Sequence, residues 1–206
     1  MAAPLPAAPG GRTRLLVLGD SFAGDFINMG LETRQLDRHA ISRSPLRSCL
    51  PAGLPADIRE TAARADFIVI ARRLTMDEVQ CLPRLIATLR AASPARVIVI
   101  GRKSFGYNNN AIKLLPAAQR YDWRVRPLAD AAAVDAAARR VLPPDIYVDT
   151  LAMLGDAEGR VRVFTPGRMF ISQDNEHLTR AGAAYVGAIL FRHPALAALH
   201  AGRPPS

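Results

Sequence analysis

A serine and a histidine, far apart in the chain, have the surroundings that nucleophilic catalysis needs. Ser21 follows Gly19 and Asp20 directly after an apolar run, which would put its hydroxyl at a helix start, where backbone N–H groups favour negative charge. A serine hydroxyl needs a base, and His177 lies just before a later helical segment, with Asp174 three residues earlier. A carboxylate at that spacing can hold the imidazole while its other nitrogen faces the serine. The pattern predicts acyl transfer through these residues.

Each of these residues also has a purely structural interpretation. Either Ser21 or Asp20 would cap a helix, and the segment from Asp174 to His177 would be a polar turn before a helix. Phosphate binding is disfavoured because neither common glycine-rich phosphate pattern follows this strand. Among the histidines, His177 is the preferred base, because the others lie beside a basic stretch or in the Pro/Ala-rich end: His39, His193 and His200.

The elements that must position these residues alternate along the chain. Apolar runs typical of strands covered on both faces lie at residues 14–19, 65–71, 95–101 and 145–149, with a weaker candidate at 36–41. Helical patterns lie at residues 21–31, 75–92, 128–142 and 179–191; the second starts with a capping box of Thr75 and Glu78. This alternation predicts a three-layer α/β/α sandwich with a doubly wound, mainly parallel sheet. Ligands would bind beyond the carboxyl ends of its strands.

The composition fits one globular domain. The chain has 206 residues, of which 50% are hydrophobic and 22% are charged, and it shows no internal repeat or interdomain linker. We expect a tail at residues 1–12, the domain at 13–195 and a second tail at 196–206. No apolar run approaches the roughly 20 residues of a membrane span. The start lacks the features of a secretory signal, which predicts a cytoplasmic location.

The net charge of +9 raises nucleic acid or another anion as a partner. All the cations except Lys103 and Lys113 are arginines, and they are scattered. We find no zinc-ligand cluster, basic helix or RNA-binding aromatic motif, so the sequence predicts no nucleic-acid partner, no metal and no cofactor.

The two cysteines, Cys49 and Cys81, have neither CxxC spacing nor histidine companions. We interpret them as buried or free thiols, with a disulfide as the alternative in an oxidising compartment. Neither follows a strand beside a histidine, so we expect neither to be catalytic.

A polar loop follows the strand at residues 95–101. Asn108 and Asn110 offer amides for sugar hydroxyls, and Tyr107 offers a stacking face, with Lys103 nearby. The structural alternative is a turn of residues that tolerate positive φ.

The blocks Gly19-Asp-Ser21 and Asp174-x-x-His177-Leu-Thr resemble the first and last blocks of the SGNH (GDSL-type) hydrolase superfamily. Residues 65–75, and the ending from Tyr147 onward, resemble SGNH domains fused to acyltransferase-3 membrane proteins. The similarity spans residues 12–192. It implies an SGNH/flavodoxin-like fold, with Ser21 as nucleophile, His177 as general base and Asp174 as orienting carboxylate. It also implies acyl ester substrates, including O-acetyl sugars.

The sequence departs from the superfamily where the oxyanion donors should be. The superfamily uses a glycine after its second strand and an asparagine after its third, and here Arg72 and Arg73 occupy the second of these turns. Arg73 would donate instead or bind an anionic substrate, with a solvated surface arginine as the alternative. Gly53 is the candidate for the glycine, and the loop with Asn108 would also supply donors. Losing one such donor costs roughly 3 to 4 kcal/mol.

These features together predict a serine-dependent carbohydrate O-acyl esterase, most simply an O-acetyl esterase, or an O-acetyltransferase. The expected partners are an acylated sugar or polysaccharide and an acyl donor, which by resemblance would be a membrane protein. The same resemblance offers a periplasmic location as the alternative. The rival functions are a non-catalytic carbohydrate-binding module on the same fold and an anion or nucleic-acid binder.

Overall fold

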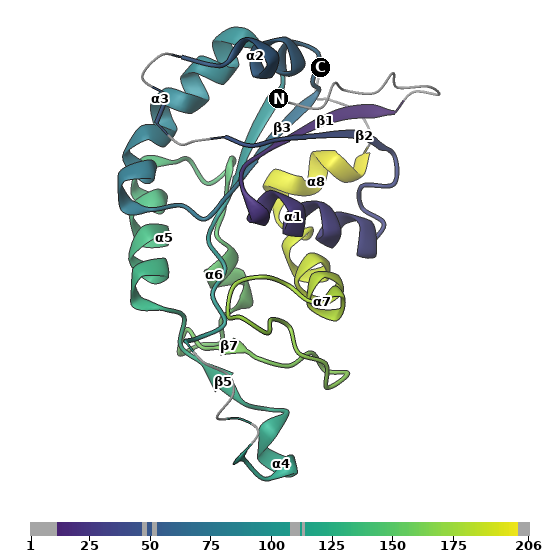
Figure 1. The fold of residues 1–206 in the computed structure, drawn as a ribbon, viewed down its shortest axis with the longest axis vertical. Helices are drawn as coiled ribbons and strands as arrows, with labels where there is room; N and C mark the ends of the chain where they lie inside the picture. Colours follow the sequence, from purple (N-terminus) through teal and green to yellow (C-terminus); the bar gives the residue numbers. More distant parts are fainter. Residues whose placement is uncertain (1–11, 47–48, 51–52, 108–111, 113, 202–206) are drawn as a thin grey trace.

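Five parallel strands form the central sheet, in the order β2-β1-β3-β4-β6 (Figure 1). In this computed structural model the described residues are 12–46, 49–50, 53–107, 112 and 114–201. The strands are β1 (Thr13–Leu18), β2 (His39–Ser44), β3 (Phe67–Ala71), β4 (Arg96–Ile100) and β6 (Tyr147–Val148). The continuous Leu, Ile and Val runs of the three central strands are buried, as expected of strands covered on both faces.

The order in which strands are added to the sheet reverses after β2: β1 pairs with β2 on one side and with β3 on the other. The chain first builds one edge of the sheet and then returns to build the other. The connections that follow β1 and β3 therefore leave toward opposite sides of the sheet. Open α/β sheets bind ligands at such a switch point.

Helices cover both faces of the sheet, which confirms the predicted three-layer α/β/α architecture (Figure 1). One layer contains α1 (Ser21–Glu32), α7 (Arg180–Leu190) and α8 (Pro194–Ala201), and their apolar sides share one core with the sheet. The opposite layer contains α2 (Ala56–Ala63), α3 (Met76–Ala92) and α5 (Ala129–Val141), which share the second core. The predicted capping box at the start of α3 is present.

A small arm extends from one end of the sheet (Figure 1). It pairs β5 (Arg124–Val125) with β7 (Val161–Arg162) and carries α4 (Ala117–Arg120); α6 (Thr150–Leu154) lies between β6 and β7. Ile112, Val163 and Phe164 form a separate apolar cluster there. Strands of two residues have no readable alternation, which explains why the sequence did not predict this arm.

Two expected boundaries are corrected. The tail expected at residues 196–206 begins instead as part of α8, with Leu196 and Leu199 buried in the core. This segment has apolar residues at helical spacing, but its Pro- and Ala-rich composition is more typical of a tail. The second strand runs from His39 to Ser44, further on than the predicted 36–41. The tail expected at residues 1–12 lies outside the described residues except for Arg12.

Cys49 and Cys81 form a disulfide, which corrects the interpretation as free thiols. The bond joins the segment after β2 to α3, two elements that the sequence could not place side by side. Within the described part of the chain, no helix is both long and apolar enough to cross a membrane.

Candidate active site

Ser21 is the first residue of α1 and lies just beyond the end of β1. Gly19 makes the turn possible, because a Cβ at this position would lie 1.8 Å from the carbonyl oxygen of Ala71 on β3. Asp20 is the helix cap: its Oδ1 accepts the N–H of Phe22 at 2.9 Å. Since Asp20 performs the capping, the Ser21 hydroxyl is left to interact elsewhere.

The loop at residues 174–177, called here the histidine loop, presents His177 to this hydroxyl. Nε2 of His177 lies 2.8 Å from Oγ of Ser21, across 156 positions of sequence. On the other side of the ring, Nδ1 lies 2.5 Å from Oδ2 of Asp174. The other Asp174 oxygen accepts the backbone N–H groups of Glu176 and His177, at 3.1 and 2.8 Å. The structure therefore brings together the three residues that the sequence singled out.

Asp174 is held in its charged form by these contacts. Partial burial would raise its pKa, but the hydrogen bonds from the His177 ring and from the backbone N–H groups outweigh it and lower the pKa to about 2. An ionised carboxylate at this position fixes the tautomer of the imidazole and stabilises an imidazolium, so His177 can take a proton from Ser21.

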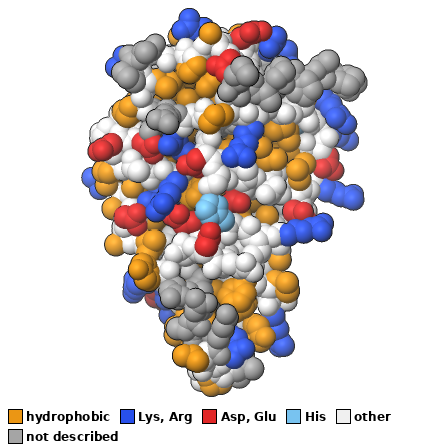
Figure 2. Space-filling model, in the orientation of Figure 1, with side chains coloured by type: hydrophobic (Ala, Val, Ile, Leu, Met, Phe, Trp, Pro, Cys, Tyr) orange, Lys and Arg blue, Asp and Glu red, His pale blue; other side chains and the backbone are white. Residues whose placement is uncertain are grey.

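The site is open to solvent. The side chains of His177 and Asp174 are 48% and 56% exposed, and Ser21 is exposed as well. Figure 2 shows acidic and basic side chains gathered around a histidine in the middle of one face. A large substrate can therefore approach the hydroxyl without first entering a channel.

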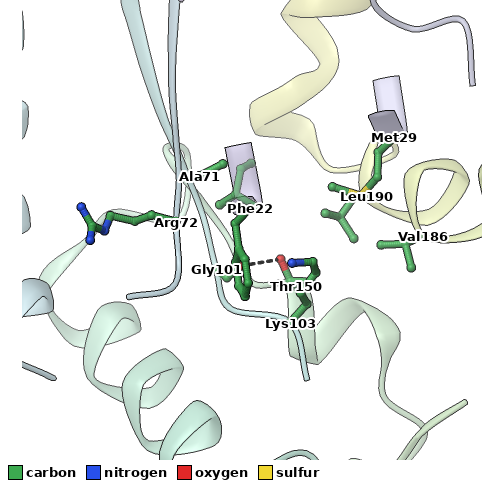
Figure 3. A pocket seen from close by; sticks show the side chains of 10 residues that line it. Phe22, Met29, Ala71, Arg72, Gly101, Lys103, Thr150, Val186 and Leu190 are labelled. Carbon is green, nitrogen blue, oxygen red and sulfur yellow. Dashed lines mark hydrogen bonds between the residues drawn. The ribbon is translucent and has the colours of Figure 1, made fainter. Parts of the chain in front are cut away.

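Phe22, the residue after Ser21, lines a small apolar cavity (Figure 3). Its volume is about 10 Å³, which is roughly the space of one water molecule. Phe22, Lys103, Thr150 and Leu190 are among the residues that line it, and Thr150 donates a hydrogen bond to the Gly101 carbonyl oxygen at its edge. This cavity cannot hold a long acyl chain.

Arg73 lies at the rim of the site. Its backbone N–H donates to Oδ2 of Asp20 at 3.0 Å, and its Nε lies 3.1 Å from Oε1 of Glu176. The turn after β3 is thus joined to both the serine turn and the histidine loop. Nε is occupied by the carboxylate and the side chain is about half exposed, so the terminal guanidinium nitrogens are the donors that remain for a substrate.

The other predicted binding residues have different placements. Tyr107 is 83% exposed, and its carbonyl oxygen accepts from Nδ2 of Asn175, which puts it beside the histidine loop. Asn108 and Asn110 lie outside the described residues. The N–H of Gly53 donates to the Leu50 carbonyl oxygen, so in this structure it is not available to an oxyanion.

Sequence reasoning missed several charged residues around the site. Arg43, near the end of β2, donates from Nη2 to the carbonyl oxygen of Asp20 at 2.7 Å. Its place at a strand end was the available signal, but the second strand was predicted to end too early. Asp25, Arg102 and Glu176, which sequence reasoning also missed, lie buried behind the histidine loop. Lys103, expected beside the sugar-binding loop, is buried with them rather than facing a sugar.

No group of three or more His, Cys, Asp or Glu side chains that could hold a metal ion occurs among the residues the structure describes.

The family model of the SGNH domain (fused to AT3 domains) matches residues 3–192 of the chain. The chain belongs to the SGNH family. This SGNH domain is accordingly an enzyme of the ester hydrolase or acyltransferase class. Among curated proteins, no sequence matches it.

A solved structure supports the fold of the SGNH domain. A protein described as a GDSL-like lipase from Parabacteroides merdae superposes with a TM-score of 0.54 at 13% sequence identity. The match covers 89% of this chain and 96% of the other. At that identity the similarity concerns the architecture alone.

Proposed function

We propose that this SGNH domain is a carbohydrate O-acetyl esterase or O-acetyltransferase that uses Ser21 as nucleophile, His177 as general base and Asp174 as orienting carboxylate. The observation that carries the proposal is the position of the His177 ring, 2.8 Å from the serine hydroxyl and 2.5 Å from the carboxylate. Both distances suit proton transfer and charge stabilisation in acyl transfer.

The reaction begins when His177 Nε2 takes the hydroxyl proton and Ser21 Oγ attacks the acyl carbonyl. The tetrahedral intermediate collapses, His177 returns the proton to the departing sugar oxygen, and the acyl group remains on Ser21. Water or a second sugar hydroxyl, deprotonated by the same imidazole, then attacks the acyl carbon; the bond to Ser21 Oγ breaks, and His177 returns the proton to Ser21 Oγ. Exclusion of water from the acceptor position distinguishes the transferase from the esterase.

The negative oxygen of the intermediate needs hydrogen-bond donors. The N–H of Ser21 at the start of α1 is one donor, and the helix dipole adds to it. Arg73 is the second donor that we propose, since its half-exposed guanidinium stands where the superfamily has asparagine. Arg43 is a third, because its guanidinium already contacts the peptide that precedes Ser21. The loop with Asn108 keeps its predicted role as a further source of donors.

The shape of the site supports a short acyl group on a large carrier. The cavity lined by Phe22, about 10 Å³, has room for a small group and not for a long chain, and acetyl is the acyl group that we propose. The open face around His177 admits a polysaccharide, and the exposed ring of Tyr107 beside the histidine loop suits stacking on a sugar. The arginines at the rim favour acceptors that carry a negative charge.

The Cys49–Cys81 disulfide supports a place for the domain in an oxidising compartment, and we propose the periplasm rather than the cytoplasm. The description of the family, a domain fused to AT3 domains, supports a membrane-bound acyl donor as partner.

The test is a fluorophosphonate serine probe applied to the purified domain, followed by acetate release and acetyl transfer on acetylated oligosaccharides. We expect labelling of the wild type and none of Ser21→Ala. A wild-type protein that binds an acetylated sugar but neither labels nor turns over would instead support the non-catalytic binding module. Binding that weakens steeply with salt and does not depend on acetylation would support the anion binder.

A further inference from the structure

Two consecutive cations, Arg102 and Lys103, follow β4 and are buried beneath the histidine loop. The side chains of Arg102 and Lys103 are only 3% and 4% exposed. A charge withdrawn from water is costly unless it is paired, so the identity of each partner indicates what the charge holds in place.

Arg102 pairs with the residue before His177. Its Nη2 lies 2.9 Å from Oε1 of Glu176, which is itself almost buried. Its Nη1 lies 2.9 Å from Asp130, an exposed carboxylate at the start of α5. Arg73 contacts the same Glu176 oxygen from the rim. Glu176 is therefore fixed from two directions, by the segment after β4 and by the turn after β3.

Lys103 reaches the residue after His177 through one intermediate. Its Nζ lies 2.9 Å from Oδ2 of Asp25, as an ion pair. The same Asp25 oxygen accepts the backbone N–H of Leu178 at 3.3 Å. The ammonium also lies 3.0 Å from the centre of the Phe22 ring, next to the nucleophile.

The geometry points to Arg102 and Lys103 as positioning residues that hold His177 from both sides, through Glu176 and through Asp25, at hydrogen-bond distance from Ser21. This inference rests on the proposed function for its catalytic consequence. Lys103 has a second effect, because its contacts with Asp25 and Phe22 fix the first turns of α1, where Ser21 begins the helix.

We call Arg102, Lys103 and their partners Glu176 and Asp25 the clamp. Its ion pairs add to the hydrogen bonds that already join Asn175 of this loop to Phe105 and Tyr107. The residues from Asp174 to His177 lie outside any helix or strand, and the ring of His177 is half exposed. A displacement of about 1 Å in a reacting group can cost about 100-fold in rate. Two paired, buried charges limit that displacement more strongly than surface contacts would.

The experiment compares two isosteric variants of the clamp with a matched control. Glu176→Gln removes the ion pairs with Arg102 and Arg73, and Asp25→Asn removes the pair with Lys103. The control is Asp130→Asn, which removes the exposed partner of Arg102 and leaves Glu176 in place. Three quantities are measured: the serine-probe labelling rate, the thermal unfolding midpoint, and the downfield proton resonance of His177 Nδ1–H, which Asp174→Asn assigns.

We expect Glu176→Gln and Asp25→Asn to label about 10- to 100-fold more slowly and to broaden or lose the downfield resonance while they remain folded. Asp130→Asn should behave like the wild type in all three measurements. Wild-type labelling and an unchanged resonance in both clamp variants would overturn the inference. If Glu176→Gln does not fold, the double variant Arg102→Met with Glu176→Leu replaces it, with the same expectation. This variant removes both charges of the pair, so neither is left buried without its partner.

The resonance separates this inference from the proposed function. If the wild type does not label but shows the resonance, and the clamp variants lose it, the catalytic proposal fails and the positioning role stands. If the wild type labels and the clamp variants label equally fast with an intact resonance, the reverse holds.

Discussion

His177 Nε2 lies 2.8 Å from Ser21 Oγ although 156 positions separate the two residues. Both side chains lie at the carboxyl end of the sheet. Ser21 begins the helix after β1, and His177 lies in the loop that leads into α7. The same ring contacts Asp174 on its far side at 2.5 Å. This geometry is suited to acyl transfer and goes beyond what a polar turn with a helix cap would require.

The orienting carboxylate can be tested without disturbing the loop. Asp174→Asn keeps the size of the side chain but reverses the tautomer that His177 favours, so we expect kcat on an acetylated substrate to fall about 10³- to 10⁴-fold. The substrate KM should change little. Steady-state kinetics of the two proteins give both values, and a fall of less than about 10-fold would argue against an orienting role for Asp174.

Removing a proposed oxyanion donor should lower kcat without weakening the binding of the substrate. We expect Arg73→Ala and Arg43→Ala each to lower kcat about 10- to 100-fold with little change in KM, because the donors act mainly in the transition state. Asn108→Ala, outside the described residues, has the same expectation. The control is Arg180→Ala, whose exposed ion pair with Glu32 involves α7 and α1. Wild-type kcat in all three variants would show that the oxyanion is stabilised elsewhere.

Tyr107 offers a test of the substrate class. Its ring is exposed beside the histidine loop, so Tyr107→Ala should raise KM for an acetylated oligosaccharide several-fold. The KM for a small acetyl ester such as p-nitrophenyl acetate should stay the same, because that ester has no sugar to stack. An equal change for both substrates would contradict a stacking role.

The disulfide should contribute stability rather than chemistry. It closes a loop of 32 positions, so we expect Cys49→Ser with Cys81→Ser to lower the free energy of unfolding by about 4 kcal/mol. Turnover of the folded variant should remain within a few-fold of the wild type. Urea unfolding and kinetics at the same temperature measure both quantities, and loss of activity in a folded variant would mean that the bond shapes the site.

The raised pKa of Asp135 leads us to expect that the stability of the fold depends on pH. Burial raises its pKa from 3.8 to about 6, against the hydrogen bonds from Tyr147 and from the Arg102 N–H. A carboxyl group with a raised pKa in the folded state binds more protons there than in the unfolded state. Its contribution to stability is therefore full below pH about 4 and is lost as the pH rises through about 6.

The variant that tests this is Asp135→Asn, which cannot ionise. Relative to Asp135→Asn, the wild type should lose about 1 to 3 kcal/mol of unfolding free energy between pH 4 and pH 8. Urea unfolding of both proteins across that range gives the difference. A difference that stays constant with pH would show that Asp135 titrates normally.

The local features of the chain follow from short stretches of its sequence. An apolar run precedes Gly19, Asp20 and Ser21 and a helical pattern follows them, which places these three residues at a strand end. Thr75 with Glu78 marks the start of α3, and the structure has that capping box. Such features depend on neighbours within a few residues, so spacing alone determines them.

The spacing of residues along the sequence does not determine the contacts between distant segments. The partners of Arg102 and Lys103, the pairing of Cys49 with Cys81, and the two-residue strands of the arm all require elements that the sequence does not place side by side. Arg73 is such a case: its sequence position marked it as a donor, and only the folded chain set its Nε against Glu176.

The sequence by itself therefore determined the order of the elements and the three residues that meet at the site, because periodicity, capping and turn chemistry act locally. The tertiary structure alone decided how firmly those residues are held and which donors remain beside them. Side-chain pairing between segments far apart in the chain depends on the twist, register and packing of the sheet. Those are properties of the whole chain.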